Sequence, residues 1–509
     1  MQRSISQNFL FYIINFLFYD TCMPNIEDII DKLPSPPKKD VELLHHAYDF
    51  ALKAHQGQER KSGEPYFVHV FATAKYLAEL GMNPTVIAAG FLHDTVEDTT
   101  VTAKDIEKEF GKEVLELVKG VTKLGTVKYK GVERNVENLR KFFVAMAADP
   151  RVLIIKLCDR LHNVQTLTHV REDKRERIAK ETLEIYAPLA NRLSLGKLKG
   201  ALEDAAFPYA YPEGYEQAKK ALKERKEMDE KHLIDFQKLF AQKLKQEKID
   251  LVSLDHRVKH LYSLWKKLTK YDGDITRVHD IMAVRVIVKS IEDCYRVLGI
   301  IHGTWKPLPG RIKDYIALPK SNGYRSLHTT ILTGTGGIVE VQIRTEEMHL
   351  EAEYGIAAHF AYKERIKLHN KDIKKQYEWI EQLRDTQKGI KDTDDFFASL
   401  KMDFFQSRVF VFTPKGDVID LPEGGSVVDF AYHVHSDIGN RATGAKVNGK
   451  FVSLESKLHN GDIVEVTVQK NAKPNPKWLE FVKTSIARNR IRAYFKHNPI
   501  EKKYEKYLT

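Results

Sequence analysis

The chain has 509 residues, of which 42% are hydrophobic and 30% charged, and it carries a formal net charge of +11. Its length predicts three or four domains at about 150 residues each, with the composition of a soluble globular protein. The cysteines Cys22, Cys158 and Cys294 lie far apart, which excludes a disulfide framework or zinc cluster and favours a reducing cytosol.

The positive charge is spread along the whole chain and is not gathered in a tail. This charge can serve only to keep the protein soluble, or it can bind anionic ligands. It does not distinguish nucleotides from RNA as such ligands. The first apolar stretch, FLFYIINFLF, is about half of the ~20 residues that span a bilayer, and YDTCM offers no signal-peptide cleavage site. We expect no membrane segment and interpret residues 1–22 as an extra or disordered N-terminus before Met23.

Residues 40–200 follow a helical pattern, with breaks at Gly63, Pro84, Gly111 and Pro150, and predict one all-helical domain. Residues 201–250 are highly charged, with apolar residues at helical spacing, and predict a helical connector with one long helix.

The spacing of the apolar residues then changes from helical to partly strand-like, and residues 251–365 predict an α+β domain. DIMAVRVIVKS reads as a strand, IEDCYRVLGIIHGTW as a helix, and SLHTTILTG with GIVEVQIRT as a hairpin around GTGG. The chain has no GxxxxGK[ST] loop, which disfavours a P-loop enzyme. We expect a helical linker at 366–405, a small β-rich module at 406–469 and the start of a helical domain at 470–509.

The stretch FLHDTVEDT follows an apolar run that begins with a helix cap, Asn83, and a first-turn proline, Pro84. One helix is therefore expected to continue through it, stacking His93 on Glu97 and Asp94 on Asp98. A metal site here needs ligands from other helices, for which His69 and Asp159 are candidates. Two imidazoles and two carboxylates suit a divalent transition metal such as Mn²⁺, whereas a histidine–aspartate pair alone is more often a structural hydrogen bond.

Basic and acidic residues gather again in the α+β domain. DHRVKHLYSLWKKL places Arg257, Lys259, Ser263 and Lys267 at a loop-to-helix entry, as a ligand site or as a solvated helix face. Asp280 and Glu340 on two strands of one sheet would hold Mg²⁺ over a polyphosphate, although an ordinary half-exposed strand also explains the alternation in IVEVQIR.

The loop GRIKDYIALPKSNGYRSLHTT carries the cations Arg311, Lys313 and Lys320 and the aromatic residue Tyr324. Tyr324 could stack on a purine base or simply cover the hairpin.

These motifs resemble those of the RelA/SpoT homologue family, the long bifunctional ppGpp synthetase/hydrolases. RKSGEPYFVHV, FLHDTVEDT and KLCDRLHNVQTL resemble its HD hydrolase domain, residues 255–362 resemble its nucleotidyltransferase-like synthetase domain, and RVFVFTPKGDVIDLPEGG resembles a TGS domain. The resemblance implies a cytoplasmic enzyme that transfers the pyrophosphoryl group of ATP to the 3′-OH of GDP or GTP and hydrolyses the 3′-pyrophosphate of (p)ppGpp.

The resemblance also assigns roles to residues in the hydrolase domain. It implies Glu97 and Asp98 as the catalytic acidic pair and His69, His93, Asp94 and Asp159 as Mn²⁺ ligands. Contacts to the guanosine nucleotide are implied for Arg60, Lys61, Ser62, Asn163 and Thr166.

In the synthetase domain, the resemblance implies catalytic and Mg²⁺-binding roles for Asp280 and Glu340. ATP contacts are implied for Arg257, Lys259, Ser263 and Lys267. Tyr324 would stack on guanine, in a site with Arg311, Lys313, Lys320, Asn322 and His328.

Two features favour two working activities, because the HD and ED pairs are intact and RIKD matches the form found in bifunctional members. The TGS resemblance implies contact with tRNA on the ribosome, with His435 as the matching histidine or only a packed loop residue. We expect the chain to lack the zinc-finger-like and ACT domains with which long members continue. The alternatives are a hydrolase with a silent synthetase and a tRNA- or ribosome-binding regulator with vestigial catalytic domains.

Overall fold

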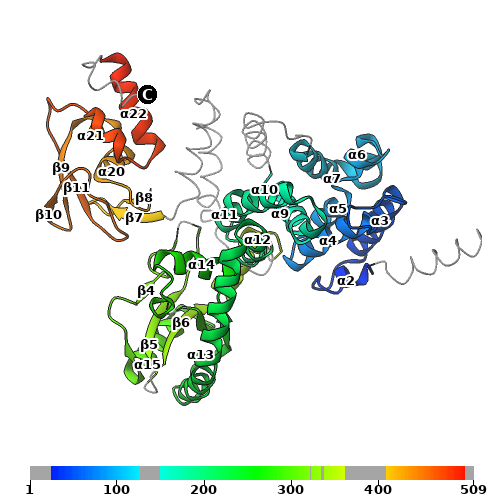
Figure 1. Cartoon of the computed structure of the whole chain (residues 1–509), viewed down its shortest axis with the longest axis horizontal. Coiled ribbons are helices and arrows are strands. Elements are labelled where there is room, and N and C mark those ends of the chain that lie inside the picture. Colours follow the sequence, from blue (N-terminus) through cyan, green and yellow to red (C-terminus); the bar gives the residue numbers. More distant parts are fainter. Residues whose placement is uncertain are drawn as a thin grey trace, which may run out of the picture. The chain divides into compact units, whose positions relative to one another are not determined.

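The structure is a computed structural model of the 509-residue chain, and it describes residues 24–125, 149–278, 280–320, 322–333, 337–361 and 408–498. The chain divides into two compact units, one up to Asp385 and one from Thr386 (Figure 1). The predicted linker at 366–405, residues 1–22 and residues 499–509 lie outside the described ranges.

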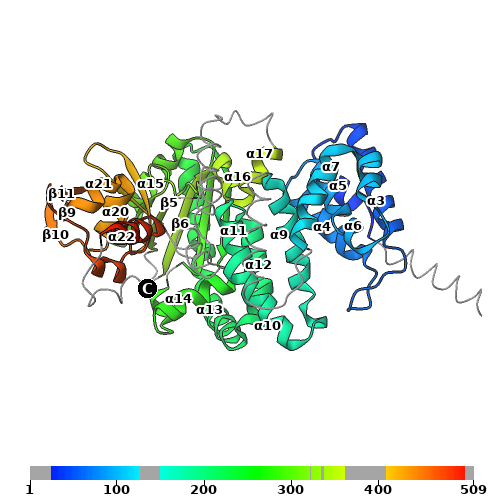
Figure 2. The same ribbon diagram turned by 90° about the horizontal axis from the view of Figure 1, so that it is seen from above.

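The N-terminal part of the first unit is all helical, as predicted, and Figure 2 shows its helices packed side by side. Helix α7 contains the expected break at Gly111, which has φ +81°. The helices are α2 (Glu27–Ile30), α3 (Lys38–Ala54), α4 (Phe67–Glu79), α5 (Pro84–Leu92), α6 (Thr95–Asp98), α7 (Ala103–Gly125), α9 (Pro150–Gln165), α10 (Glu172–Glu181), a π-helical turn (Thr182–Tyr186), α11 (Ala187–Arg192) and α12 (Gly196–Ala210).

Two central helices of this part begin with the same device. The Asn83 side chain accepts a hydrogen bond from Val86 N before α5, and the Asp149 side chain accepts one from Arg151 N before α9. In each case proline is the first helical residue, where its missing N–H costs nothing. Both helices are buried on most sides, so their starts are fixed by the caps and their positions by packing.

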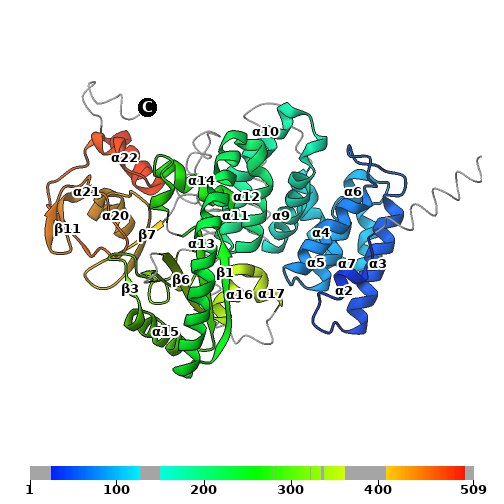
Figure 3. The same ribbon diagram turned by 60° about the horizontal axis from the view of Figure 1, so that its bottom comes forward.

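The predicted connector is the 35-residue helix α13 (Pro212–Gln246), which leads into a six-stranded sheet (Figure 3). The strand order is β1-β2-β6-β5-β3, and β4 pairs with β5. The further elements are β1 (Leu251–Val258), α14 (Leu261–Lys270), β2 (Met282–Val288), α15 (Ile291–Thr304), β3 (Lys306–Pro307), β4 (Lys313–Asp314), β5 (Leu327–Leu332), β6 (Ile338–Thr345), α16 (Glu346–Tyr354) and α17 (Ile356–Ala361).

The sheet has one apolar and one polar face. Helices α13 and α15 cover the apolar face, where Phe240 and Val297 pack with Val286 and Val341 in one core. The predicted hairpin is confirmed, because Leu332 pairs with Ile338 in the antiparallel β5–β6 ladder, while β2 and β6 run parallel with Ala283 opposite Glu340. Both strands therefore carry their polar residues toward the same side.

Helix α12 of the helical part packs directly on the α+β part. His260 lies over Gly200, where a Cβ would come within 2.3 Å of the ring, and its Nδ1 is 2.6 Å from an Asp204 oxygen. Ser263 donates to Glu203 of α12 over 3.3 Å. The loop after α11 also makes contact, since Ser194 donates to the carbonyl of Asn322.

In its described residues, the second unit contains two small sheets and three α-helices. Its elements are β7 (Arg408–Phe412), β8 (Val418–Pro422), α20 (Val427–Val434), α21 (Ser436–Arg441), β9 (Ala442–Val447), β10 (Lys450–Val452), β11 (Val464–Val468), a 3-10 turn (Pro476–Glu480) and α22 (Ser485–His497). The fully buried Asp429 joins α20 to the start of α22, because it accepts hydrogen bonds from Ser426, Lys483 N and Thr484. The β-rich module and the following helix therefore form one structure.

We predict that Asp429→Ala destabilises the second unit by about 3 kcal/mol, because it leaves several buried donors without an acceptor. Hydrogen exchange of the full chain should then be about 100-fold faster in α20 and α22, with residues 24–361 unchanged. The exposed Asp437→Ala is the matched control. Unchanged hydrogen exchange in Asp429→Ala would contradict the proposed role of Asp429 in joining α20 to α22.

Candidate functional site

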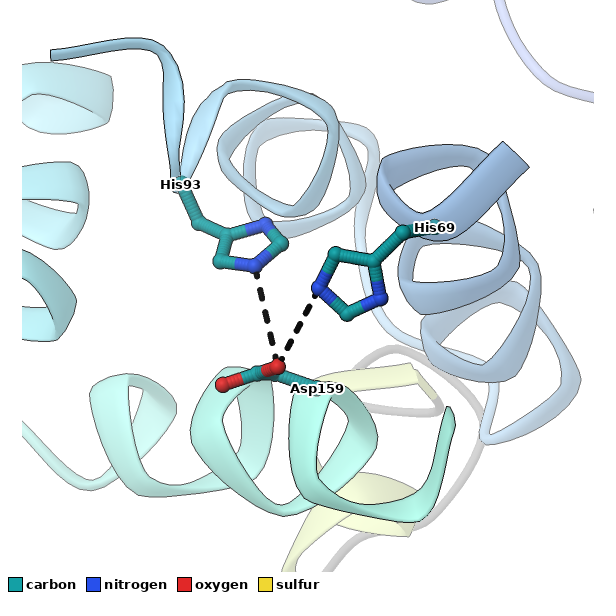
Figure 4. A group of neighbouring side chains, drawn as sticks. All are labelled: His69, His93 and Asp159. Carbon is teal, nitrogen blue, oxygen red and sulfur yellow. Dashed lines mark ion pairs between the residues drawn. The ribbon is translucent and has the colours of Figure 1, made fainter. Parts of the chain in front are cut away.

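Three helices bring His69, His93 and Asp159 together, and Figure 4 shows their side chains pointing toward a common centre. One ligand-type atom from each residue lies within 4.8 Å of the others. The Asp159 carboxylate is 3.3 Å from His69 Nε2 and 4.0 Å from His93 Nε2. Asp94 completes the set, 3.5 Å from His69 Nε2 and 3.2 Å from His93 Nε2. All four predicted ligands thus meet at one place.

The donor set fits a divalent metal. His69, His93 and Asp159 are buried, and among the described residues His93 Nε2 finds no hydrogen-bond partner. The other ring nitrogen, His93 Nδ1, is held by Gly90 O at 2.8 Å, so that Nε2 faces the centre. A second atom holding the ring in this way is typical of metal-binding histidines.

The helix that precedes His93 is shorter than predicted. Helix α5 ends at Leu92, and a separate short helix, α6, begins after Asp94, so the prediction of one continuous helix is wrong. His93 Nδ1 bonds Gly90 O and Thr95 Oγ1 donates to Leu92 O, and both contacts engage carbonyls at the helix end. The break presents His93 and Asp94 to the same centre, which adjacent residues on a straight helix would not do.

Asp159 is a buried charge that several neighbouring groups compensate. Burial alone would raise the pKa of its carboxyl, but Lys156, at 2.6 Å, and the two histidines hold that pKa well below its usual range. Lys156 contacts Oδ2 of Asp159, whereas Asn163 donates to Oδ1, the oxygen that faces the two histidines. Asp94 and Asp159 likewise raise the pKa of the buried His93 to about 9, although burial opposes this.

The acidic pair lies at the solvent side of the cluster. Glu97 and Asp98 are exposed, and Tyr66 Oη donates to Asp98 over 2.9 Å and to Asp94 over 2.8 Å. Partial desolvation, with Asp94 and Asp98 adding repulsion, raises the pKa of Glu97 to about 7. Glu97 can therefore exchange a proton near neutral pH.

Two of the predicted nucleotide contacts of the helical domain, Arg60 and Asn163, are linked to this cluster by hydrogen bonds. Arg60 donates to His162 Nδ1 over 2.8 Å and to Asn163 Oδ1 over 2.6 Å, which ties its loop to α9. Lys61 is exposed, Ser62 donates to Glu64, and Thr166 donates to the carbonyl of His162 at the end of α9. Lys61 thus faces solvent, while Ser62 and Thr166 are engaged within the chain.

Three residues of this site were not predicted: Tyr66, Lys156 and His162. Each is three positions from a predicted ligand, Tyr66 from His69 and the other two from Asp159, and so lies on the same side of a helix. This three-residue spacing from a predicted ligand is the sequence feature that could have identified them. Burial, His69 and Arg60 lower the pKa of His162 to about 3, which keeps it neutral.

A second cluster lies on the polar face of the sheet. Asp280, just before β2, forms ion pairs with Lys259, at 2.5 Å, and with Lys267 of α14. Burial would raise the pKa of Asp280, but the two lysines lower it to about 2. Arg257 lies on strand β1 and not in a loop-to-helix entry, which corrects that part of the prediction.

Glu340 begins a chain of contacts on the same face. His328 Nδ1 is 3.5 Å from Glu340, and His328 Nε2 is 2.9 Å from Tyr324 Oη. Lys320 Nζ lies 4.8 Å from the centre of the Tyr324 ring and covers part of that ring. Lys313, on β4, and the exposed Arg311 lie in the adjoining segment, whereas Ser263 and Asn322 are bonded to the helical domain.

The interpretation of β6 as a half-exposed strand is wrong. Gln342 is 8% exposed and Arg344 is fully buried, with its Nη2 3.2 Å from Glu353 of α16. Helix α16 packs against β6 and β2, so that the polar side of the strand is enclosed as well. A charged residue enclosed in this way needs partners from the protein or from a ligand.

Three stretches of the chain match protein-family models. Residues 47–196 match an HD domain, residues 256–367 match the region found in RelA / SpoT proteins, and residues 409–468 match a TGS domain. A guanosine-3′,5′-bis(diphosphate) 3′-pyrophosphohydrolase of Aquifex aeolicus (strain VF5) is 46% identical over 488 residues, covering 95% of this chain and 68% of the relative. The chain belongs to the RelA/SpoT family.

Other relatives of this RelA/SpoT family member carry different names. A GTP pyrophosphokinase of Myxococcus xanthus is 47% identical over 470 residues, which is 92% of this chain and 62% of the relative. The bifunctional (p)ppGpp synthase/hydrolase SpoT of Escherichia coli (strain K12) is 44% identical over 466 residues, 91% of this chain and 66% of the relative. The chain therefore spans about two thirds of the length of these relatives.

The predicted family and the predicted multidomain architecture are confirmed for this RelA/SpoT protein. The HD match implies a divalent metal, in agreement with the histidine and aspartate cluster. Within the described ranges, no helix combines the length and apolar character that a membrane crossing needs.

We predict that Asp280→Ala destabilises the first unit by about 1 to 3 kcal/mol, because it leaves Lys259 and Lys267 side by side without their carboxylate. Lys267 is 40% exposed, and solvent screening places the value in the lower half of this range. Urea unfolding of the full chain measures it, with the exposed Asp235→Ala of α13 as control.

The difference between wild type and Asp280→Ala should depend on pH. The folded-state pKa of Asp280 is about 2, below the ordinary value of 3.8, so its stabilisation is complete above about pH 4 and disappears as the pH falls toward 2. A difference that stays constant down to about pH 2 would show that the two ion pairs contribute nothing.

Proposed function

We propose that the protein is a bifunctional (p)ppGpp synthetase and hydrolase. The observation that supports this most directly is the presence of two separate acidic centres in one chain. One is the His69, His93, Asp94 and Asp159 cluster in the helical domain, and the other comprises Asp280, just before β2, and Glu340 of β6. The relatives named as pyrophosphokinase, pyrophosphohydrolase and bifunctional enzyme agree with it.

In the hydrolase site, His69, His93, Asp94 and Asp159 would hold Mn²⁺, which lowers the pKa of a bound water when it is present. Glu97, with a pKa near 7, would take up and release the proton of the attacking water, and Asp98 would sustain that pKa by repulsion. Arg60, Lys61 and Ser62 would neutralise and orient the phosphates of the nucleotide, with Asn163 and Thr166 alongside.

In the synthetase site, Asp280 and Glu340 would hold Mg²⁺, which neutralises phosphate charge during the transfer when it is bound. Lys259 and Lys267 now neutralise Asp280, and the ATP phosphates would become their partners instead. Glu340 would accept the proton of the 3′-OH of GDP or GTP, in a position fixed by His328. Arg257 and Ser263 would assist ATP, and Lys320, Tyr324 and Asn322, with Arg311 and Lys313, would contact the guanosine nucleotide.

The remaining partner is expected at the second unit. The TGS match supports contact with tRNA or the ribosome, and His435 is 66% exposed in its side chain, so it is available for such a contact. Its Nδ1 accepts a hydrogen bond from Asp437 N, which fixes the ring at the start of α21. We place the enzyme in the cytosol, where its nucleotides and reduced cysteines would be found.

We predict that the two activities can be removed separately. Glu97→Gln with Asp98→Asn should lower Mn²⁺-dependent release of pyrophosphate from 3′-labelled ppGpp by at least about 100-fold, because the proton acceptor is lost. Glu340→Gln should lower synthesis from ATP and GDP by a similar factor, and each variant should keep the other activity within about twofold.

EDTA and the exposed Asp173→Asn serve as controls for these assays. No hydrolysis by the folded, metal-loaded wild type would refute the hydrolase assignment. Hydrolysis without any synthesis would identify a hydrolase with a silent synthetase, and absence of both would favour a binding protein with vestigial catalytic domains.

We further propose that the two sites are coupled through residues 176–250, since simultaneous synthesis and hydrolysis would waste ATP. The contacts that support this are Ser263 with Glu203, His260 with Asp204, and Asn322 with Ser194. Two of the predicted synthetase contacts, Ser263 and Asn322, are thus bonded to the helices that follow the hydrolase cluster. A ligand that alters these helices would alter the synthetase site.

We predict that a non-hydrolysable ppGpp analogue slows synthesis in the wild type, and that Glu203→Gln with Asp204→Asn weakens this effect by about fivefold or more. Steady-state synthesis rates at increasing analogue concentration measure the coupling. Arg60→Ala removes a proposed nucleotide contact of the hydrolase site. Inhibition that persists in this variant therefore arises from direct binding of the analogue at the synthetase site. An unchanged effect in the α12 variant would rule out these contacts as the route.

A further inference from the structure

The hydrogen bonds around His162 determine which nitrogen of His69 carries a proton. Arg60 Nη1 lies 2.8 Å from His162 Nδ1, and His69 Nδ1 lies 2.9 Å from the same atom. A guanidinium group can only donate, so His162 Nδ1 must be an acceptor. The contact with His69 is then a hydrogen bond only if His69 Nδ1 is the donor and shares the single lone pair of His162 Nδ1 with Arg60.

In a neutral His69 ring, this assignment leaves Nε2 without a proton. Nε2 is the atom that faces Asp94 and Asp159 at the centre of the cluster, and a metal can bind only an unprotonated ring nitrogen. His93 has the same arrangement, with Nδ1 held by Gly90 O. The first histidine is thus oriented by a side chain and the second by the backbone.

We propose that His162 is a positioning residue that fixes the metal-binding tautomer of His69 and joins the metal centre to the nucleotide-binding loop through Arg60. The inference rests on the proposed hydrolase site. His162 is 8% exposed and His69 2%, so water is a poor substitute for the missing acceptor. Because Arg60 also binds Asn163, and Asn163 binds Asp159, the same loop reaches two ligands.

Three substitutions separate positioning from packing. His162→Leu keeps the apolar volume but removes the acceptor, and His162→Gln places an amide oxygen one bond too far from the chain. His162→Asn places its oxygen where Nδ1 stands. We expect His162→Leu and His162→Gln to weaken Mn²⁺ binding about tenfold or more. We expect His162→Asn to bind Mn²⁺ within about threefold of the wild-type affinity.

The measurement is calorimetric titration of the full chain with Mn²⁺ alone, in an Asp280→Asn background that removes a proposed ligand of the synthetase site. His93→Ala in the same background shows whether the measured binding belongs to the hydrolase cluster. Thermal unfolding without metal reports folding, and if His162→Leu does not fold, the comparison of Gln with Asn decides.

Each outcome has a distinct meaning. Weak Mn²⁺ binding by His162→Leu and His162→Gln, with near-normal binding by His162→Asn, supports the positioning role. Wild-type affinity in Leu or Gln, or equal weakening in all three variants, overturns it while the metal site stands. Binding that survives His93→Ala overturns the proposed hydrolase centre, and the role of His162 with it.

Discussion

The burial of one carboxylate, Asp159, is the constraint on which the helical domain depends. A buried charge is costly unless it is paired and hydrogen-bonded. Asp159 meets this requirement with Lys156 and Asn163 from its own helix and with His69 and His93 from two others. The packing of α4, α5 and α9 therefore places these groups together, and the same groups form the proposed metal site.

The synthetase domain solves the same problem with a different set of charges. Asp280 is compensated by two lysines, one from the β1–α14 turn and one from α14. In both domains the protein neutralises its acidic centre from within, using groups that a charged ligand would engage in turn. Such a centre is stable without its ligand, and binding exchanges partners instead of creating new charge pairs.

Much of this arrangement follows from local patterns. Caps at Asn83 and Asp149, strand alternation and the hairpin around residues 334–337 depend on neighbouring residues, and the sequence predicts them. The family motifs also identify the four residues that meet at the hydrolase centre. These features need no knowledge of distant contacts.

Of the features that sequence reasoning did not predict, one depends on local side-chain hydrogen bonds and two depend on contacts between distant segments. The break after Leu92 arises from side-chain hydrogen bonds of His93 and Thr95 to carbonyls that a regular helix would also use. The burial of Arg344 requires α16 to pack over the sheet, and the bond between Ser263 and Glu203 requires two domains to touch. Periodicity within a segment cannot report either contact.

The paired helix starts carry a consequence for how this domain can change during evolution. His93 follows Pro84 by nine residues, and Asp159 follows Pro150 by nine residues. Each residue of a helix turns the chain by about 100°, so one insertion between cap and ligand would swing the ligand away from the centre. Substitutions along these segments can be absorbed by repacking, whereas changes of length cannot. Insertions and deletions should therefore accumulate in the loops, and the two cap-to-ligand intervals should keep a constant length.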